Sequence, residues 1–347
     1  MMTFQERLAA LAALGEHLRQ GEDEYLDALQ QRTAFNNAWF TLENQQASLR
    51  AIATEFLDYK KLEGWLSPYA RYFEVSHALK GMERKTVGLV LAGNIPLVGF
   101  HDVLCVFVSG HRAQIKLSDK DPFVLPYLLQ LLGKIDERCT PYFEVVPKLA
   151  HFDAVIATGS NNSARYFDAY FGKYPNIIRR NRNGVAVLTG EESPDDLKAL
   201  GQDIFQYFGL GCRNVAKLYV PAQYEFTPLL ERLHEWRHLQ NHSKYKNNFD
   251  YNYALLTLNK APFLSNGAII IREDEAMLSH IAGLYYSYYQ ALEDVEQELV
   301  QRADEIQLVT ALPHALRLET KNFGEAQRPG LSDYADGVDT MAFLLSL

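Results

Sequence analysis

One cysteine of this 347-residue chain lies in a setting that suits a nucleophile. Cys212 follows Gly209-Leu210-Gly211, and glycines let the backbone come close to a ligand. The neighbouring Arg213 favours a thiolate, which is both a good nucleophile and a good acyl carrier. The alternative is an inert buried thiol, which describes Cys105 better because apolar residues surround it in the sequence.

A second candidate is the asparagine in Ala92-Gly93-Asn94-Ile95-Pro96, a turn that leaves an apolar run. The carboxamide of Asn94 could donate a hydrogen bond to an oxyanion in a cleft. Asparagine is also a common turn former, so an ordinary turn is the alternative.

Two further groups suit a nucleotide cofactor. Lys116, Ser118 and Asp119 end a predicted strand, at the edge of a parallel sheet where nucleotides bind, although a solvated charged run would look the same. Thr158, Gly159 and Ser160 form a strand-to-helix turn whose amides could face a pyrophosphate, and ordinary helix caps share this pattern.

The first half of the chain predicts the elements that must position these residues. Apolar periodicity indicates helices over 4–72. Strands at 86–91, 114–116, 143–146 and 154–157 then alternate with helices at 98–109, at 122–132 and after Ser160. This alternation predicts an α/β fold with a doubly wound parallel sheet.

The second half is predicted to be α/β as well. We expect strands at 185–188 and 217–220, short apolar runs at 268–271 and 306–310, and helices at 195–208, 227–239, 245–256 and 274–289. With the boundary near Thr189, the predicted parts are a helical N-terminus with a dinucleotide-binding domain (1–189), a catalytic domain (190–325) and a C-terminal segment (326–347) without an assigned place.

Composition narrows the class of protein. With 48% hydrophobic and 22% charged residues the chain can bury a large core, and a net charge of −9 argues against nucleic acid as a partner. Three cysteines suggest no disulfide framework, and no signal-peptide pattern opens the chain, so we expect a cytoplasmic protein. The apolar stretch 87–110 contains Asn94, Pro96, His101 and Asp102, which predicts buried core and no membrane span.

One motif suggests a different chemistry. His234-Glu235-Trp236-Arg237-His238 matches the H-E-x-x-H pattern of zinc proteases, and His242 could supply a third ligand. The same run also reads as the polar face of a helix whose other face carries leucines. We therefore expect no metal.

Taken in order, these fragments resemble the aldehyde dehydrogenase superfamily from about Val87 to Val220, with fainter similarity to the C-terminus. Asn94-Ile95-Pro96 is similar to the Asn-Phe-Pro motif, and 115–119 is similar to Lys-Pro-Ser-Glu. The turn 158–160, after Phe152-Asp153, resembles Phe-Thr-Gly-Ser, and 209–212 resembles the Gly-Gln-x-Cys nucleophile segment.

The resemblance implies a fold and a set of roles. The fold would be aldehyde-dehydrogenase-like, with a doubly wound cofactor domain and an α/β catalytic domain. Cys212 would be the nucleophile and Asn94 the oxyanion donor. The cofactor residues would be Lys116, Ser118 and Asp119 at the adenosine ribose and Thr158, Gly159 and Ser160 at the pyrophosphate.

The chain departs from the superfamily pattern at one important place. Where aldehyde-oxidising members have Glu-Leu-Gly-Gly, this sequence has Arg179-Arg180-Asn181-Arg182-Asn183-Gly184, which offers no carboxylate to activate water. An acyl-enzyme would then survive until hydride arrives, which points to the acyl-CoA reductases of LuxC type.

The implied reaction is reduction of an acyl-CoA, expected to be a fatty acyl-CoA, to the aldehyde by NADPH or NADH. NADPH is slightly favoured because Asp119 is shorter than the usual glutamate and leaves room for a 2′-phosphate near Lys116. Two alternatives stay open, namely an aldehyde-oxidising dehydrogenase and a catalytically silent cofactor- or CoA-binding protein. Whether the protein forms a homo-oligomer also stays open, because the chain is shorter than typical superfamily members.

Overall fold

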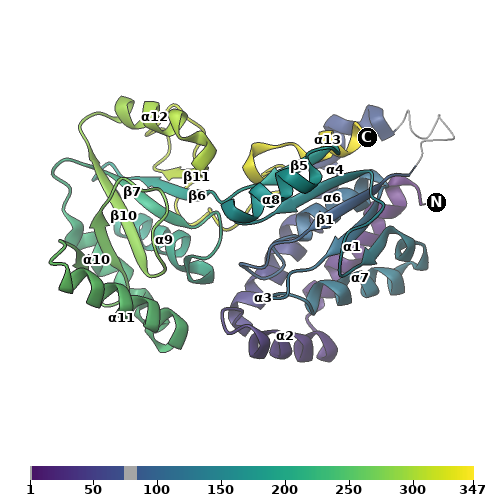
Figure 1. Ribbon diagram of the computed structural model, residues 1–347, viewed down its shortest axis with the longest axis horizontal. Coiled ribbons are helices and arrows are strands. Elements are labelled where there is room, and N and C mark those ends of the chain that lie inside the picture. Colours follow the sequence, from purple (N-terminus) through teal and green to yellow (C-terminus); the bar gives the residue numbers. More distant parts are fainter. Residues whose placement is uncertain (1, 74–83) are drawn as a thin grey trace. The chain divides into compact units, whose positions relative to one another are not determined.

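The computed structural model describes residues 2–73 and 84–347, which form two compact units (Figure 1). Unit 1 comprises 1–180 together with 329–347, and unit 2 comprises 181–328. The predicted boundary near Thr189 lies beyond this division, because strand β6 (Asn183–Val187) pairs with strands of unit 2. Most of the segment 326–347, which was assigned to neither domain from the sequence, belongs to unit 1.

The N-terminal part of unit 1 is helical, as the periodicity predicts. Its elements are α1 (Phe4–Gln20), α2 (Glu24–Asn36), α3 (Leu42–Ala51), a π-helical turn η1 (Ile52–Phe56), α4 (Tyr59–Leu66) and η2 (Ser67–Tyr69). Thr3 and Glu6 form a capping box at the start of α1, which satisfies amides that have no partner inside the helix. The apolar stripe Leu8, Leu11 and Leu14 is fully buried and packs α1 against the rest of the unit.

Sheet A of unit 1 consists of five parallel strands: β1 (Thr86–Val90), β2 (Arg112–Lys116), β3 (Phe143–Val145), β4 (Ala154–Thr158) and β5 (Asn176–Arg179). Their order is β3-β2-β1-β4-β5. The connecting helices are α6 (Phe100–Ser109), α7 (Val124–Ile135), η3 (Glu137–Tyr142) and α8 (Asn161–Phe171). The strand order reverses direction beside β1, as in doubly wound folds, so the predicted doubly wound parallel sheet is confirmed. Strand β5 was not predicted from the sequence.

The C-terminal segment returns to unit 1 through η7 (Ala335–Gly337) and α13 (Thr340–Leu345). A buried ion pair fixes it, because Arg179 of β5 donates to Asp102 of α6 at 2.6 Å and to the Thr340 hydroxyl at 3.0 Å. The Tyr69 hydroxyl donates to Asp339 at 2.6 Å. These bonds join α6, β5 and α13 into one packed face.

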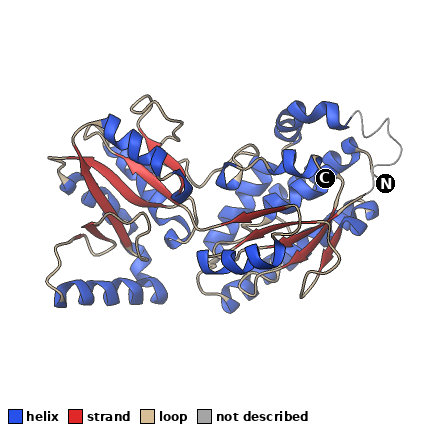
Figure 2. Ribbon diagram, turned by 45° about the horizontal axis from the view of Figure 1, so that its top comes forward, coloured by secondary structure: helices blue, strands red, loops and turns tan. Residues whose placement is uncertain are grey.

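Sheet B of unit 2 has six strands: β6, β7 (Val215–Pro221), β8 (Leu264–Ser265), β9 (Ile270–Glu273), β10 (Gly283–Tyr289) and β11 (Ile306–Ala311). Their order is β11-β6-β7-β10-β9-β8, and all pairs are parallel except β8 with β9. The helices are α9 (Pro194–Phe205), η4 (Gln206–Gly209), α10 (Phe226–Leu233), η5 (His234–Asn241), α11 (Ser243–Leu258), α12 (Leu292–Gln301) and η6 (Ala303–Glu305). Figure 2 shows the strands of both sheets with helices packed along them.

One predicted element is wrong. The helix expected over 274–289 is a loop followed by strand β10. Tyrosine-rich segments have high strand propensity, and β10 pairs on both sides, with β7 and β9. Pairing within the sheet therefore makes this segment a strand, although its sequence predicted a helix.

The predicted apolar stretch 87–110 is core, since it forms β1, a turn and α6, whose side chains are largely buried. Among the residues that the structure describes, none of the helices is long and apolar enough to cross a membrane.

Candidate active site

Cys212 lies in unit 2, on the short connection between η4 and the central strand β7. Its side chain is partly exposed, whereas Cys105 and Cys139 are fully buried in unit 1. Burial raises the pKa of the Cys105 thiol well above its usual range and that of Cys139 to about 11. Among the three thiols, Cys212 is thus the one that a solvent-borne substrate can reach.

The backbone before Cys212 is strained. Tyr207 and Phe208 have φ angles of 55° and 59°, in the left-handed region that is costly for residues with a side chain, and Gly209 follows at 73°. Non-glycine residues in this region cost about 1–3 kcal/mol each and persist only where the surroundings hold them. Such strain is concentrated at functional sites in many proteins.

The loop closes on itself through Asn214, which is 2% exposed. The Asn214 backbone amide donates to the Gly211 carbonyl at 3.1 Å, and the Gly211 amide donates to the Asn214 side-chain oxygen at 2.8 Å. These two bonds define a four-residue turn with Cys212 at its second position.

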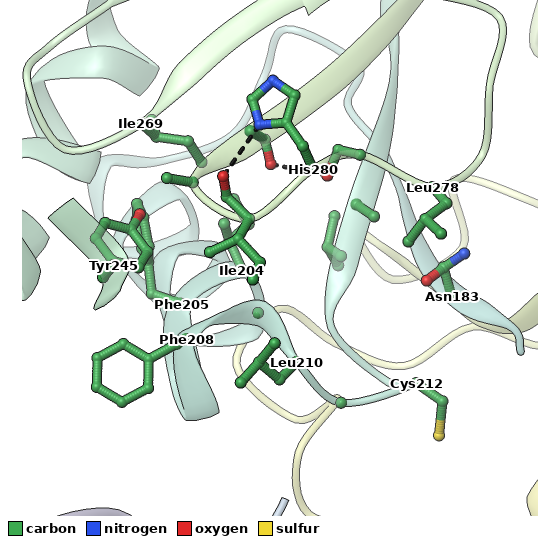
Figure 3. Close-up of a pocket in the computed structure, with 18 of the residues that line it drawn as sticks. Asn183, Ile204, Phe205, Phe208, Leu210, Cys212, Tyr245, Ile269, Leu278 and His280 are labelled. Carbon is green, nitrogen blue, oxygen red and sulfur yellow. Dashed lines mark hydrogen bonds between the residues drawn. The ribbon is translucent and has the colours of Figure 1, made fainter. Parts of the chain in front are cut away.

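A cavity of about 320 Å³ lies beside this loop, entirely within unit 2 (Figure 3). Its wall includes aromatic and aliphatic side chains, namely Phe205, Phe208, Leu210, Tyr245, Ile269 and Leu278, beside polar groups. Figure 3 shows Cys212 at one end of this group, with its sulfur directed away from Phe205, Phe208 and Tyr245. Cys212 therefore stands at the rim of a cavity whose wall is partly apolar and partly polar.

Apart from the guanidinium of Arg182, the polar side chains that line the cavity carry no charge. The amides of Asn181 and Asn183 and the imidazole of His280 line it, and no lining residue is an aspartate or glutamate. Burial lowers the pKa of His280, whose Nδ1 lies 3.0 Å from the Ile281 carbonyl oxygen, so the ring is neutral at pH 7. The cavity wall thus lacks a carboxylate that could activate water.

A buried lysine, Lys217, fixes the loop 274–282, which carries His280. Lys217 of β7 is 0% exposed, and its ammonium donates to the Asp274 carbonyl and, at 2.5 Å, to the Ser287 hydroxyl. Burial lowers its pKa to about 8. Lys217 therefore has a structural explanation, namely to anchor one wall of the cavity.

In unit 1, the other predicted residues gather at one edge of sheet A. Asn94 follows β1, Lys116 ends β2 and Thr158 ends β4, and these three strands are neighbours. Because all are parallel, their carboxyl ends share one edge, where nucleotides bind in doubly wound sheets. A Cβ on Gly93 would meet the Ser118 hydroxyl at 2.3 Å, so the first two turns are in direct contact.

The Asn94 turn is fixed by two buried polar groups. Leu97 has a φ of 55°, and its amide donates to the Asp121 carboxylate at 2.8 Å. The Ser48 hydroxyl donates to the Pro96 carbonyl at 2.8 Å. Burial raises the pKa of Asp121 to about 6, although the Leu97 bond lowers it.

The two predicted cofactor turns differ in their polar contacts. The loop after β2 is tied to the end of α2, since Asn36 donates to the Asp119 carbonyl at 3.4 Å and Asn37 donates to the Lys120 carbonyl at 3.3 Å. Ser160 is the N-cap of α8 and accepts from the Ser163 amide at 3.2 Å. Its hydroxyl therefore already has a local role as a helix cap.

The H-E-x-x-H run does not take the form of a zinc helix. Residues 234–241 form the 3-10 helix η5, in which residues four apart are about 120° apart around the axis. His234 and His238 use Nδ1 toward the carbonyls of Asn266 and Glu235. Within the described residues, no group of three or more histidine, cysteine, aspartate or glutamate side chains could hold a metal ion.

The segment that replaces Glu-Leu-Gly-Gly divides between the units. Arg179 is buried against Asp102 in unit 1, and Arg180 pairs with the exposed Asp168 at 3.1 Å. Arg182 donates to the Ala303 carbonyl at 3.0 Å within unit 2. Each of these three arginines therefore makes a contact inside a single unit, and the ion pair of Arg180 lies at the surface.

Comparison with known proteins supports the fold. No protein-family profile matches the sequence, and no curated protein matches it significantly. Solved structures do match, among them aldehyde dehydrogenase 21 from Physcomitrella patens in complex with succinate, at a TM-score of 0.60 and 15% identity over 91% of this chain and 74% of that one.

Two further matches are an NAD-dependent aldehyde dehydrogenase from Sinorhizobium meliloti and an NADP-dependent enzyme from E. coli. The first has a TM-score of 0.62 at 13% identity, covering 91% of this chain and 71% of that chain. The second has a TM-score of 0.62 at 14% identity, covering 95% and 77%. The predicted aldehyde-dehydrogenase-like α/β fold is confirmed.

Sequence reasoning missed several residues of the cavity and loop. Asn214 could have been noticed from its place two residues after Cys212, but its hydrogen bonds depend on the fold of the loop. Tyr245 and His280 carry no local signal, because the cavity assembles from segments far apart in the sequence.

Proposed function

We propose that this protein is an NAD(P)H-dependent acyl-CoA reductase that forms a thioester on Cys212. One observation carries the proposal: a partly exposed cysteine on a strained loop stands at the rim of a cavity whose wall contains no carboxylate. A thiolate in this setting can accept an acyl group, and the wall contains no carboxylate that could activate water against the resulting thioester.

The reaction begins with attack of the Cys212 thiolate on the thioester carbon of the acyl-CoA. The bond between that carbon and the CoA sulfur breaks, CoA leaves as its thiolate, and an acyl-Cys212 thioester remains. When bound, the reduced nicotinamide supplies the hydride that this acyl carbon accepts. The carbon–sulfur bond to Cys212 then breaks, which releases the aldehyde and restores the thiolate.

Two groups are assigned to the charge that develops on the acyl oxygen. The Cys212 amide and the Asn94 carboxamide would donate hydrogen bonds to it, and one such donor is typically worth about 3–4 kcal/mol. Asn94 takes this role from the resemblance, and its turn is held rigid by Asp121 and Ser48. Rigidity matters because a donor that is already oriented costs no reorganisation during the reaction.

The cofactor is assigned to unit 1. Lys116, Ser118 and Asp119 offer an ammonium, a hydroxyl and a carboxylate at the carboxyl edge of sheet A, a donor set that fits ribose hydroxyls and a phosphate. Thr158, Gly159 and Ser160 would face the pyrophosphate at the start of α8. We slightly favour NADPH over NADH because Asp119 is shorter than the glutamate usual at this position and leaves room for a 2′-phosphate near Lys116.

Aldehyde oxidation is the second candidate, because the solved structures with this fold include aldehyde dehydrogenases. It requires a base to activate water, or CoA as the acceptor of the acyl group. Incubation with aldehyde and NAD(P)⁺, once with CoA and once without it, separates the two outcomes by the product, which is either free acid or acyl-CoA.

The proposal is tested with a spectrophotometric assay of NADPH and NADH consumption over a series of acyl-CoAs, combined with mass spectrometry of the protein. Acyl-CoA without cofactor should leave one acyl group on Cys212 and release one equivalent of CoA. Cys212→Ala should abolish both labelling and turnover while binding of NADPH, measured by fluorescence, is retained.

Cys139→Ala is the matched control, since Cys139 is fully buried in unit 1. It should be labelled and turn over as the original protein does. Acyl labelling that persists in Cys212→Ala contradicts the assignment. Binding of acyl-CoA without labelling or turnover of the unaltered protein supports the silent binding protein instead.

A further inference from the structure

Resting on the proposed function, we infer that Asn214 is a positioning residue, which holds the turn that presents Cys212 to the acyl group. Its side chain is 2% exposed and does not depend on any group outside unit 2. It lies two residues after Cys212 in the sequence, and its side chain bonds to Gly211, the residue directly before Cys212.

Both ends of the Asn214 carboxamide are engaged. Its oxygen accepts from the Gly211 amide at 2.8 Å. Its nitrogen donates toward three carbonyl oxygens, those of Asp203 at 2.9 Å, Ile204 at 3.3 Å and Gln206 at 2.9 Å. One side chain thus connects the residue before Cys212 to the end of the preceding helix.

These bonds answer a need of helix α9, which ends at Phe205. The last carbonyls of a helix have no partner inside it and must be satisfied by a cap, a side chain or water. Asn214 supplies a buried donor for carbonyls at this end, and the chain can then turn through the left-handed residues Tyr207, Phe208 and Gly209. The strained segment is held at one side by Asn214.

The main chain of Asn214 adds two contacts that fix the same turn. Its amide donates to the Gly211 carbonyl at 3.1 Å, and its carbonyl accepts from the Gly184 amide at 2.9 Å. A Cβ on Gly184 would meet the Arg213 carbonyl oxygen at 2.7 Å, so strand β6 begins directly against the loop. Cys212 and Arg213 are thereby left at the corner of a turn whose other two residues are immobilised.

Few side chains can replace asparagine here. The site needs an acceptor for Gly211 and donors for the helix carbonyls on one short side chain. Aspartate would set a carboxylate against three carbonyl oxygens, leucine offers neither a donor nor an acceptor, and serine cannot span both sides. A residue of the right shape without hydrogen bonds should therefore release the loop without leaving a large void.

The test compares Asn214→Leu with the unaltered protein by two measurements. Hydrogen exchange of the peptide covering 206–214 should become at least about 10-fold faster, since the Gly211 amide loses its partner and a tenfold change in opening corresponds to about 1.4 kcal/mol, the size of one or two hydrogen bonds. Acyl transfer from acyl-CoA to Cys212 in a single turnover should slow by roughly 10- to 100-fold, because small misplacements of a reacting group have effects of this size.

A third measurement separates positioning from general damage. Iodoacetamide is small and reacts from many directions, so its rate with Cys212 should stay within about threefold, since orientation is the term that acyl transfer alone requires. KM for NADPH should be unchanged. Cys105 and Cys139, which are buried, should stay unmodified if the variant is folded.

Tyr289→Phe is the matched control, because it removes a single hydrogen bond of 2.8 Å, from the Tyr289 hydroxyl to the Leu188 carbonyl, at the far end of the same sheet. It should leave both acyl transfer and exchange of 206–214 unchanged. If Asn214→Leu does not fold, Asn214→Ser provides the comparison, with the same direction expected for both measurements.

The outcomes distinguish this inference from the proposed function. Unchanged exchange over 206–214, or faster exchange with acyl transfer at the original rate, overturns the positioning role. If the unaltered protein takes no acyl group from acyl-CoA, the proposed function fails. Faster exchange in Asn214→Leu would then show only that Asn214 orders the loop, and the role in positioning a catalytic nucleophile would be rejected together with the function.

Discussion

Asp203 should make the stability of unit 2 fall as pH rises, and Asp203→Asn should remove that dependence. Asp203 is 0% exposed, and its carboxylate accepts from the amides of Gly324 at 2.7 Å and Ala326 at 3.0 Å. Burial raises its pKa from 3.8, the value of an exposed aspartate, to about 7 despite these two bonds. Glu325 raises the pKa further and Arg328 lowers it.

The sign and size follow from linkage. The pKa is higher in the folded state, so between about pH 4 and pH 7 the folded protein holds a proton that the unfolded chain has lost. The free energy of unfolding is therefore greatest below the unfolded pKa and falls by up to about 1.4 kcal/mol per pH unit as pH rises. Over three units the total is about 4 kcal/mol.

Asparagine at this position cannot ionise, and it keeps one acceptor oxygen for the two amides. At pH 5 the variant should be less stable by about 1–3 kcal/mol, the cost of one unsatisfied buried amide. Near pH 8, where the charged Asp203 costs more than that, the variant should be the more stable protein. The two profiles of unfolding free energy should cross between these values.

The assay is urea unfolding at pH 5, 6, 7 and 8, followed by the fluorescence of Trp236. This tryptophan packs against Gly201 of α9 and stacks on Phe205 at 5.3 Å, so it reports on the helix that carries Asp203. Both proteins are compared in a background in which Trp39 and Trp65, which belong to unit 1, are phenylalanine. Parallel pH profiles for the two proteins would refute the reasoning, because they would mean that Asp203 is ionised in the folded state at no cost.

Two further predictions concern the cavity and the unit 1 core. Asn183→Asp places a carboxylate on the cavity wall next to Gly184, which hydrogen-bonds to the Cys212 turn. This carboxylate should activate water, so free acid should form from acyl-CoA about 10²-fold faster or more, whereas Asn183→Ala should show no such increase. Release of CoA without formation of acid would contradict this prediction. Arg179→Met leaves Asp102 buried without its partner and should lower the free energy of unfolding by about 3–5 kcal/mol in urea titrations. Adding Asp102→Asn should restore part of this loss. An equal loss in the single and the double variant would argue against the ion pair as the cause.

Much of the fold could be predicted because hydrophobic periodicity is a local signal. The strands β1, β4 and β6 are buried parallel strands that appear in the sequence as short apolar runs, and β7 is such a run apart from Lys217. Strand β5 escaped because its four residues, Asn-Ile-Ile-Arg, carry polar residues at both ends. Arg179 ends this strand, and only the fold brings Asp102 beside it.

The error over 274–289 shows where a local signal fails. The tyrosines of β10 fit either a helix or a strand, and the choice depends on β7 and β9, which flank the segment in space. His280 was therefore assigned to the wrong kind of element, and its place on the cavity wall could not be predicted. Cys212 could be proposed from the sequence because its signal is a short motif, whereas Asn214 bonds to carbonyls that only the folded helix end brings together.

The two units place their candidate residues by opposite rules. In unit 1, the residues expected to bind the cofactor lie at the carboxyl ends of β2 and β4, and Asn94 follows β1 between them, at the edge where a doubly wound sheet concentrates ligands. In unit 2, Cys212 precedes the amino end of β7, so sheet topology alone gives no reason for a site there. What takes its place is a loop held by side chains: Asn214 ties the turn to the end of α9, and the first residues of β6 pack against it. The position of Cys212 thus depends on its loop rather than on its sheet. Under the proposed function, a substitution two residues away should therefore affect acyl transfer more than one at the far end of the same sheet.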